Sequence, residues 1–183
     1  MSNTRLTAIP VVLLLCLALI LSLFACQDGG LLSPKPAAEQ GIKNPTFVRV
    51  LPGDKDVLRP ALVESNSAVV TAAQGGAVTC GHVTLVVPAG ALSEDTEISI
   101  EIENPSILVA DFGPEGLEFN TPVVMRWNLA GTSAEGGAQS TESLYFHETT
   151  QLWEEIDMLS PPDSNTTETE IEHFSKYAQA TGG

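Results

Sequence analysis

Cysteine and basic side chains are scarce in this chain of 183 residues. It has three cysteines, and its eight lysines and arginines stand against 23 acidic residues. From residue 61 onward two basic residues face 19 acidic ones, a net charge of −17. A surface of that sign repels phosphate backbones and anionic lipid headgroups, so we expect no nucleic-acid partner. Basic proteins or divalent cations could be attracted, or the acidic surface simply keeps the domain soluble.

Sequence motifs for metal or cofactor chemistry are also lacking. No Gly-rich phosphate loop precedes a helix, and His82, His147 and His173 lie too far apart in sequence for a zinc motif. Asp163-Ser164-Asn165 and Glu168 match only part of a calcium loop, which favours an ordinary polar loop before a strand. The sequence therefore predicts no cofactor, no metal site and no enzymatic activity.

One long apolar run is present, at the N-terminus. A polar start with Arg5 as its one basic residue leads into apolar residues 8–24, and Ala25 precedes Cys26. This order is typical of a secretory signal. Residues 6–25 are also long enough for an uncleaved transmembrane anchor, while the lack of amphipathicity argues against a buried core helix.

Cys26 makes the signal more specific. Leu23-Phe24-Ala25-Cys26 resembles the lipobox of bacterial lipoproteins, which implies a diacylglycerol on the Cys26 thiol and cleavage before it. We therefore expect residues 1–25 to be a lipoprotein signal peptide and Cys26 to attach the chain to membrane lipid. The alternatives are the uncleaved anchor and a plain signal peptide with Cys26 incidental. Gln27 after the cysteine favours the outer membrane, if the cell has one.

Residues 26–60 are expected to be a flexible linker. Their first part, to about residue 44, is rich in Gly, Pro, Ala and polar residues and has no period. Phe47-Val48-Arg49-Val50 is either a short strand or part of the linker. Removal of the signal and lipidation of Cys26 leave Cys80 alone, so no intramolecular disulfide can form, and we expect Cys80 to be buried and inert.

Residues 61–183 have the pattern of a single all-β domain. Residues 96–103 alternate Ile with Glu, Ser or Thr, the period of a half-buried strand. About seven to nine short strands in this length predict a β-sandwich. The other candidate strands lie at residues 83–87, 123–127, 144–147, 152–156 and 167–173, and the breaks between them are rich in Gly and Pro.

Several segments in order resemble the ZU-five domain, the β-sandwich of zonula occludens proteins, netrin receptors and ankyrins; bacterial envelope lipoproteins carry similar domains. The resemblance covers about residues 67–180 and implies a module for protein–protein contacts. It rests on Gly75-Gly76-Ala77-Val78, on residues 83–92 with Thr96-Glu97-Ile98, on Gly113-Pro114-Glu115-Gly116 with Phe119, on Leu144-Tyr145-Phe146 with Trp153, and on His173-Phe174-Ser175-Lys176-Tyr177.

The His173-Phe174-Ser175 triplet is the one motif with chemistry in it. Some relatives of the ZU-five domain cut themselves between the Phe and Ser of such a triplet. By that resemblance Ser175 would attack the Phe174 carbonyl, His173 would act as base and then as acid, and water would hydrolyse the ester. The structural alternative makes His173 a core histidine in parity with Thr169 and Ile171, with Phe174 a packing residue.

Two exposed tryptophans would offer a further site. Trp127 and Trp153 could form a carbohydrate platform, although in a sandwich of this size they are more often core residues. We therefore expect a lipid-anchored, extracytoplasmic and non-catalytic interaction or structural module of the cell envelope, with an envelope or extracellular protein as partner. The alternatives are a domain that cleaves itself between Phe174 and Ser175, and a carbohydrate-binding or adhesion module.

Overall fold

The computed structural model describes residues 41–53, 63–159 and 165–182. Cys26 and the predicted signal at residues 1–25 lie outside the described residues, as do residues 26–40 and 54–60 of the predicted linker. Within the described part, no helix is long and apolar enough to span a bilayer. The same part contains ten strands and one 3₁₀ turn: β1 Glu64–Val70, β2 Gly76–Cys80, β3 Val83–Val87, β4 Thr96–Ile102, β5 Val109–Gly113, β6 Glu118–Asn128, η1 Glu135–Gly137, β7 Thr141–His147, β8 Leu152–Ile156, β9 Thr166–His173 and β10 Lys176–Thr181.

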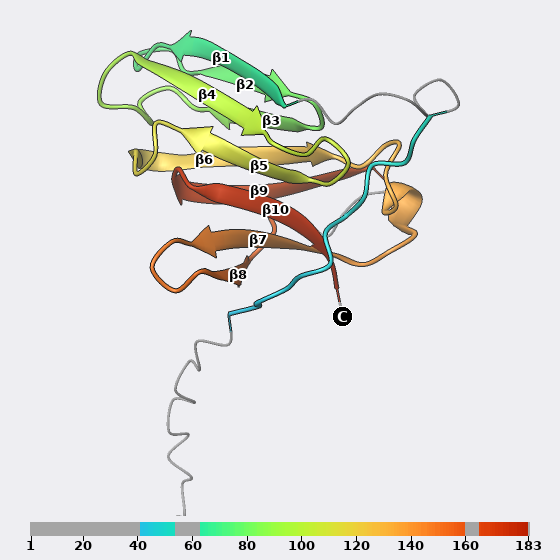
Figure 1. Cartoon of the computed structure of the whole chain (residues 1–183). Coiled ribbons are helices and arrows are strands. Elements are labelled where there is room, and N and C mark those ends of the chain that lie inside the picture. The colour runs from blue at the N-terminus through green and yellow to red at the C-terminus, as the bar shows by residue number, and fades with distance from the viewer. Residues whose placement is uncertain (1–40, 54–62, 160–164, 183) are drawn as a thin grey trace, which may run out of the picture. The chain divides into compact units, whose positions relative to one another are not determined.

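The strands form two antiparallel sheets packed face to face (Figure 1). The larger sheet has the order β1-β4-β5-β10-β7-β8 and the smaller one β2-β3-β6-β9. Among the described strands the chain changes sheet six times, first between β1 and β2 and last between β9 and β10. An all-β sandwich is therefore confirmed, with ten strands among the described residues where seven to nine were expected.

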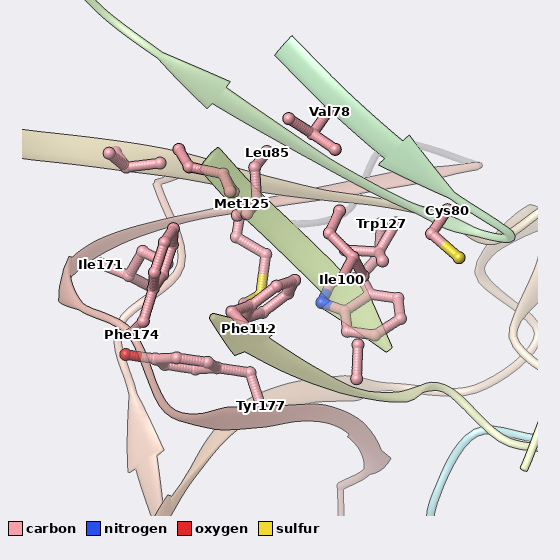
Figure 2. Packing of buried hydrophobic residues seen from close by; sticks show 14 of the residues in the cluster. Val78, Cys80, Leu85, Ile100, Phe112, Met125, Trp127, Ile171, Phe174 and Tyr177 are labelled. Carbon is pink, nitrogen blue, oxygen red and sulfur yellow. The ribbon is translucent and has the colours of Figure 1, made fainter. Parts of the chain in front are cut away.

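Alternation along the strands forms the core between the sheets. In β4, Ile98 and Ile100 are fully buried while Glu97 and Glu101 are exposed, as the period of two predicts. Strand β3 likewise buries Val83, Leu85 and Val87. Figure 2 shows side chains of both sheets meeting in this core. Full burial of one such aliphatic side chain contributes about 1.5–3 kcal/mol.

The turn after β3 confirms a prediction from its sequence. Strand β3 ends at Val87, directly before Pro88, which has no N–H to donate to a ladder. Gly90 has a φ of +80°, which a side chain would disfavour. Its N–H donates to the Ala72 carbonyl at 2.8 Å, so the turn is joined to the segment between β1 and β2.

A second apolar cluster lies on the outer face of the larger sheet. It contains Leu144 of β7, Trp153 of β8, and Ala178 and Ala180 of β10. Residues 41–53, which we call the N-terminal strap, supply Ile42 and Phe47 to cover it. The strap runs beside β10, β7 and β8 in Figure 1. The outer face of the larger sheet is therefore buried at this end.

The strap also enters the sheet. The Val48 N–H donates to the Gln179 carbonyl of β10, and the Val48 carbonyl accepts from the Leu108 N–H, both at 2.9 Å. Phe47 and Arg49 form antiparallel bridges to Ala180 and Ile107. Val48 is fully buried in the main core. The folded unit therefore includes residues 41–53 and extends further toward the N-terminus than the boundary at residue 61 expected from the sequence.

Candidate functional site

His173-Phe174-Ser175 lies where the chain crosses between the two sheets. His173 is the last residue of β9 in the smaller sheet, and Lys176 is the first of β10 in the larger one. Phe174 and Ser175 make the crossing. Because the connection has only two residues, the sandwich fixes its position tightly.

Phe174 is a core residue. Its side chain is 1% exposed, and its ring lies edge-on to Phe119 at a centroid distance of 4.8 Å and tilted against Phe112 at 6.0 Å. Figure 2 shows it beside Ile171 and Tyr177. Its N–H donates to the Leu117 carbonyl at 2.9 Å. These contacts match the structural alternative for Phe174.

The Phe174 carbonyl has two nitrogen neighbours. The Gly116 N–H donates to it at 3.4 Å, and Nδ1 of His173 lies 3.4 Å from the same oxygen. Gly116 takes a φ of +73° in the turn before β6, a conformation that glycine adopts without strain. Two N–H donors at one carbonyl oxygen are the arrangement that stabilises an oxyanion. Gly116 supplies one donor, and His173 supplies the second only in the tautomer that carries a proton on Nδ1; both distances exceed the 2.7–3.1 Å typical of such donors. Sequence reasoning found no oxyanion donor, because Gly116 lies 58 positions before Phe174.

Ser175 is directed away from the base. Its hydroxyl donates to the Phe146 carbonyl of β7 at 3.1 Å, whereas Nδ1 of His173 contacts the Phe174 oxygen. Activation of a serine requires its hydroxyl to lie within about 2.6–3.2 Å of the base. Within the described chain, positive φ angles occur at glycines and at Gln151, and neither Phe174 nor Ser175 has one. In the described state, therefore, the Phe174 carbonyl has neighbours suited to an oxyanion, but the Ser175 hydroxyl is not activated as a nucleophile.

Two tyrosines surround the His173 ring. Tyr145 lies edge-on to it at 5.4 Å, and the Tyr177 hydroxyl donates to the His173 carbonyl at 2.8 Å. Burial, followed by the charges of Tyr145 and Glu172, raises the pKa of Tyr177 well above its ordinary value. Burial also raises the pKa of Tyr145, with Glu154 and Glu148 adding to the effect. Both phenols therefore remain neutral hydrogen-bonding groups at physiological pH. His173 itself is half-buried at the end of β9, so it is more exposed than Ile171 and Thr169, which are buried in the core.

The three histidines do not converge. The rings of His147 and His173 both lie edge-on to Tyr145, at centroid distances of 5.8 and 5.4 Å. Nδ1 of His82, by contrast, lies 2.8 Å from the Asn128 carbonyl. Asn128 pairs with Thr166, seven residues from His173 along β9, or about 23 Å at 3.3 Å per residue. Among the described residues, no three His, Cys, Asp or Glu side chains are grouped as metal ligands.

Both candidate carbohydrate-binding tryptophans are buried. Trp127 is 1% exposed between the sheets, and Trp153 is 8% exposed in the second cluster beneath the strap. Phe47 and Phe146 pack on Trp153 at centroid distances of 5.2 and 5.1 Å. Neither indole offers a free face to a sugar ring, which removes the reason for a carbohydrate platform.

Glu168, one residue of the partial calcium loop, forms an ion pair with Arg126. Glu168 accepts from Nε of Arg126 at 2.7 Å and lies 2.6 Å from Nη2 of the same side chain. Asp163 and Ser164 lie outside the described residues, and the Asn165 carbonyl accepts from the Leu129 N–H at 2.8 Å. Glu168 therefore serves as the partner of a neighbouring strand's arginine.

Cys80 is buried at the end of β2, as expected. Burial raises the pKa of its thiol, and the negative charge of Glu64 raises it further. Since the thiolate is the reactive form, both effects make Cys80 unreactive in the folded state.

Lys176 forms a charged cluster that sequence reasoning missed. Its ammonium group lies 3.0 Å from Asp111 of β5 and 3.8 Å from Glu103. Burial alone would lower the pKa of Lys176, but its hydrogen bond to Asp111 and the charges of Asp111, Glu103 and Glu148 outweigh it and raise that pKa.

A hollow of about 60 Å³ beside Lys176 is lined also by Glu101, Ile107 and Val109. Ligand pockets are typically about 300–1,000 Å³, so this one holds only a few waters.

A scan of protein-family models finds no match to this chain, and a search of curated proteins finds none either. The two-sheet sandwich is established by the structure alone. Because no family model matches, the ZU-five resemblance stays a proposal.

Proposed function

We propose that this protein is a lipid-anchored, extracytoplasmic component of the cell envelope whose ZU-five-like sandwich is a non-catalytic interaction module. The observation that carries the proposal is Leu23-Phe24-Ala25-Cys26, at the end of an apolar run and before polar residues. Acylation of Cys26 places the anchor in a membrane, with the outer membrane favoured in a cell that has one. Its direct partners are membrane lipid and a protein of the envelope or of the extracellular space.

The described domain supports a binding role over a catalytic one. Phe174, Tyr177 and Trp127 pack in its core, and Ser175 donates to a backbone carbonyl. The hollow at Lys176 is too small for a typical substrate. The chemistry-bearing residues that the sequence suggests thus have structural partners, which leaves the outer surface for function.

The distance between anchor and domain is limited by the chain. Fifteen residue steps separate Cys26 from Gly41, where the strap begins. A fully extended chain of that length spans at most about 50 Å. Gly41 would therefore lie within that distance of the membrane, and a partner could reach further only by the width of the domain.

Metabolic labelling with a fatty acid tests the anchor. We expect the label on the wild-type protein and its loss in Cys26→Ala, together with an intact mass that begins at Cys26 and includes acyl chains. Cys16→Ala and Cys80→Ala are matched controls that should keep the label. Unlabelled wild-type protein, or a mass beginning at Met1, would contradict the proposal.

Self-cleavage at Phe174–Ser175 is the second candidate function. It is favoured by the two nitrogen neighbours of the Phe174 carbonyl, Gly116 N–H and His173 Nδ1. A turn of the Ser175 side chain from Phe146 toward His173 would be needed first. Mass spectrometry should then find a nine-residue fragment that starts at Ser175, absent in Ser175→Ala. An uncut wild-type chain after prolonged incubation would rule the reaction out.

A further inference from the structure

The two sheets together have four edge strands, of which β8 and β9 have backbone partners elsewhere in the chain and β2 has a side-chain partner on β1. On β8, Trp153 exchanges two backbone hydrogen bonds with Ile42 of the strap, at 2.6 and 3.0 Å. On β9, Thr169 forms a bridge with Met158. On β2, the Thr79 carbonyl accepts from the Asn66 side chain at 2.8 Å. Covered edges of this kind prevent pairing with foreign strands.

Strand β1 is the fourth edge. Strand β2 packs against its core-facing side, where Asn66 donates to Thr79, but within the described part of the chain no backbone group pairs with the edge itself. Strand β1 pairs with β4 over seven consecutive residues in one unbroken register. No described backbone group hydrogen-bonds to its other side. Its sequence, Glu-Ser-Asn-Ser-Ala-Val-Val, contains no lysine or proline, the residues that commonly protect edges. Val69 is 68% exposed on it, and Val63 just before it is 58% exposed.

Carboxylates surround this edge without counter-charges. Glu97 accepts a hydrogen bond from Ser67 at 2.8 Å, and Glu101 pairs with Ser65, so both lie on the outer face of the sheet. Glu64 lies on the other side of β1, opposite Ile102, where its charge acts on Cys80. The ion pairs of the described residues use Arg126 and Lys176, and neither reaches these three glutamates. The negative potential along β1 is therefore not neutralised by the described chain.

Small side chains leave room for a partner's cations to reach those carboxylates. Ser65 and Ser67 stand on the outer face of β1, next to Glu101 and Ser99 of β4. An added strand would lie about 4.8 Å beyond β1 and about 10 Å from β4. Lysine or arginine side chains on that strand can extend over the two serines to Glu97 and Glu101. An acidic strand would meet like charges at the same places.

We propose that β1 is a docking edge for an extended, basic polypeptide segment, which adds a seventh strand to the larger sheet. Backbone hydrogen bonds to β1 give the segment its affinity. Every second side chain of the segment is basic, and its contact with Glu97 or Glu101 gives specificity. This deepens the proposed interaction function by naming the edge and the charge of the partner. A second copy of this chain is a poor occupant, because two edges that each have Glu97 and Glu101 beside them on the outer face repel.

The test uses the full chain in neutral detergent micelles and three ten-residue peptides. The first alternates lysine and threonine, the second replaces lysine with glutamate, and the third is the first with every backbone nitrogen methylated. The third peptide keeps the charge but loses backbone hydrogen bonds. Calorimetry measures affinity, and hydrogen–deuterium exchange locates protection.

We expect the lysine peptide alone to bind, to slow exchange in residues 63–70, and to weaken with added salt. Val69→Lys should weaken it about tenfold, because it places a cation on the docking edge. Leu159→Lys is the matched control: Leu159 is also exposed, at 49%, but follows β8, and its variant should bind within about twofold of wild type.

Any of five results would overturn the docking edge. The first four are equal binding of the N-methylated peptide, protection elsewhere than β1, equal weakening by Leu159→Lys, and protection of β1 by self-association without peptide. The fifth is absence of binding by the lysine peptide. Labelling of Cys26 in the same preparation separates failure of this edge from failure of the anchor.

Discussion

The ring of Phe47 lies edge-on to the indole of Trp153, with the centroids 5.2 Å apart and the planes at 71°. Phe47 belongs to the N-terminal strap, and Trp153 belongs to the edge strand β8. The contact closes the second apolar cluster over Ala178 and Ala180. It therefore joins the start of the folded unit to β8 and, through the cluster, to β10, the last strand in sequence.

Phe47→Ala should destabilise the domain by about 2 kcal/mol. Fully buried Phe→Ala changes cost about 3–5 kcal/mol, and Phe47 is only partly buried, while the aromatic pair adds about 0.5–1.5 kcal/mol. Urea unfolding followed by tryptophan fluorescence measures the loss. Val69→Ala at an exposed position is the control and should stay within about 0.5 kcal/mol of wild type. An equal effect of both changes would show that the strap contributes little.

A chain that starts at Val63 should fail to fold, whereas one that starts at Gly41 should fold. The shorter chain loses Val48 from the core and the backbone partners of Leu108 and Gln179. Buried backbone groups without partners each cost about 1–3 kcal/mol. Dispersed amide NMR signals from the 41–183 chain, and their collapse in the 63–183 chain, are the expected result. Equal dispersion in both would contradict the role of the strap.

Ser143→Ala should cost about 2 kcal/mol. The buried Ser143 hydroxyl accepts from Nε2 of Gln179 at 2.6 Å and lies 2.7 Å from the Thr169 hydroxyl, so it joins β7, β10 and β9. Its removal leaves a buried amide donor unsatisfied. A double-mutant cycle with Thr169→Val should give a coupling energy of about 0.5–3 kcal/mol. Strict additivity would mean that the three groups do not act as one network.

Stability should fall above pH 10, and Tyr177→Phe should reduce that fall. The pKa of Tyr177 is raised in the folded state, so above pH 10 the unfolded chain loses a proton that the folded chain keeps. The resulting slope approaches about −1.4 kcal/mol per pH unit for this group. At pH 7 the variant should instead be less stable by about 1 kcal/mol, because the hydrogen bond to the His173 carbonyl is lost. Unfolding curves from pH 7 to 11 measure both effects, and parallel pH profiles would contradict the assignment.

The strands that sequence predicted well are those with one buried face. Strands β3 and β8 have the expected bounds, and β4 differs by one residue, because apolar and polar residues alternate clearly along β4. Strand β10 was missed because it is buried on both faces: Tyr177 and Gln179 face the core, and Ala178 and Ala180 face the strap. Strand β1 lacks the pattern for the opposite reason, since nearly all of it is exposed.

The surroundings of the candidate site depend on contacts between distant residues. The sequence indicates His173, Phe174 and Ser175 as neighbours and predicts Phe174 as a packing residue. It could not show that Ser175 donates to Phe146, 29 positions earlier, or that Gly116 donates to the Phe174 carbonyl. The Lys176 cluster likewise arises from the register of β10 on β5, which pairs Lys176 with Asp111. Such pairings follow from topology, which local patterns do not specify.

A lipid on Cys26, as proposed, would connect membrane attachment mechanically to the folded domain through the strap. If Cys26 holds a lipid, any force between membrane and domain enters through Gly41 and is carried first by the Ile42–Trp153 hydrogen bonds. Behind them the load passes to Val48, which sits between β10 and the residues before β5. The protein is thus held through the middle of its larger sheet, and a pull strong enough to free the strap would also open the core.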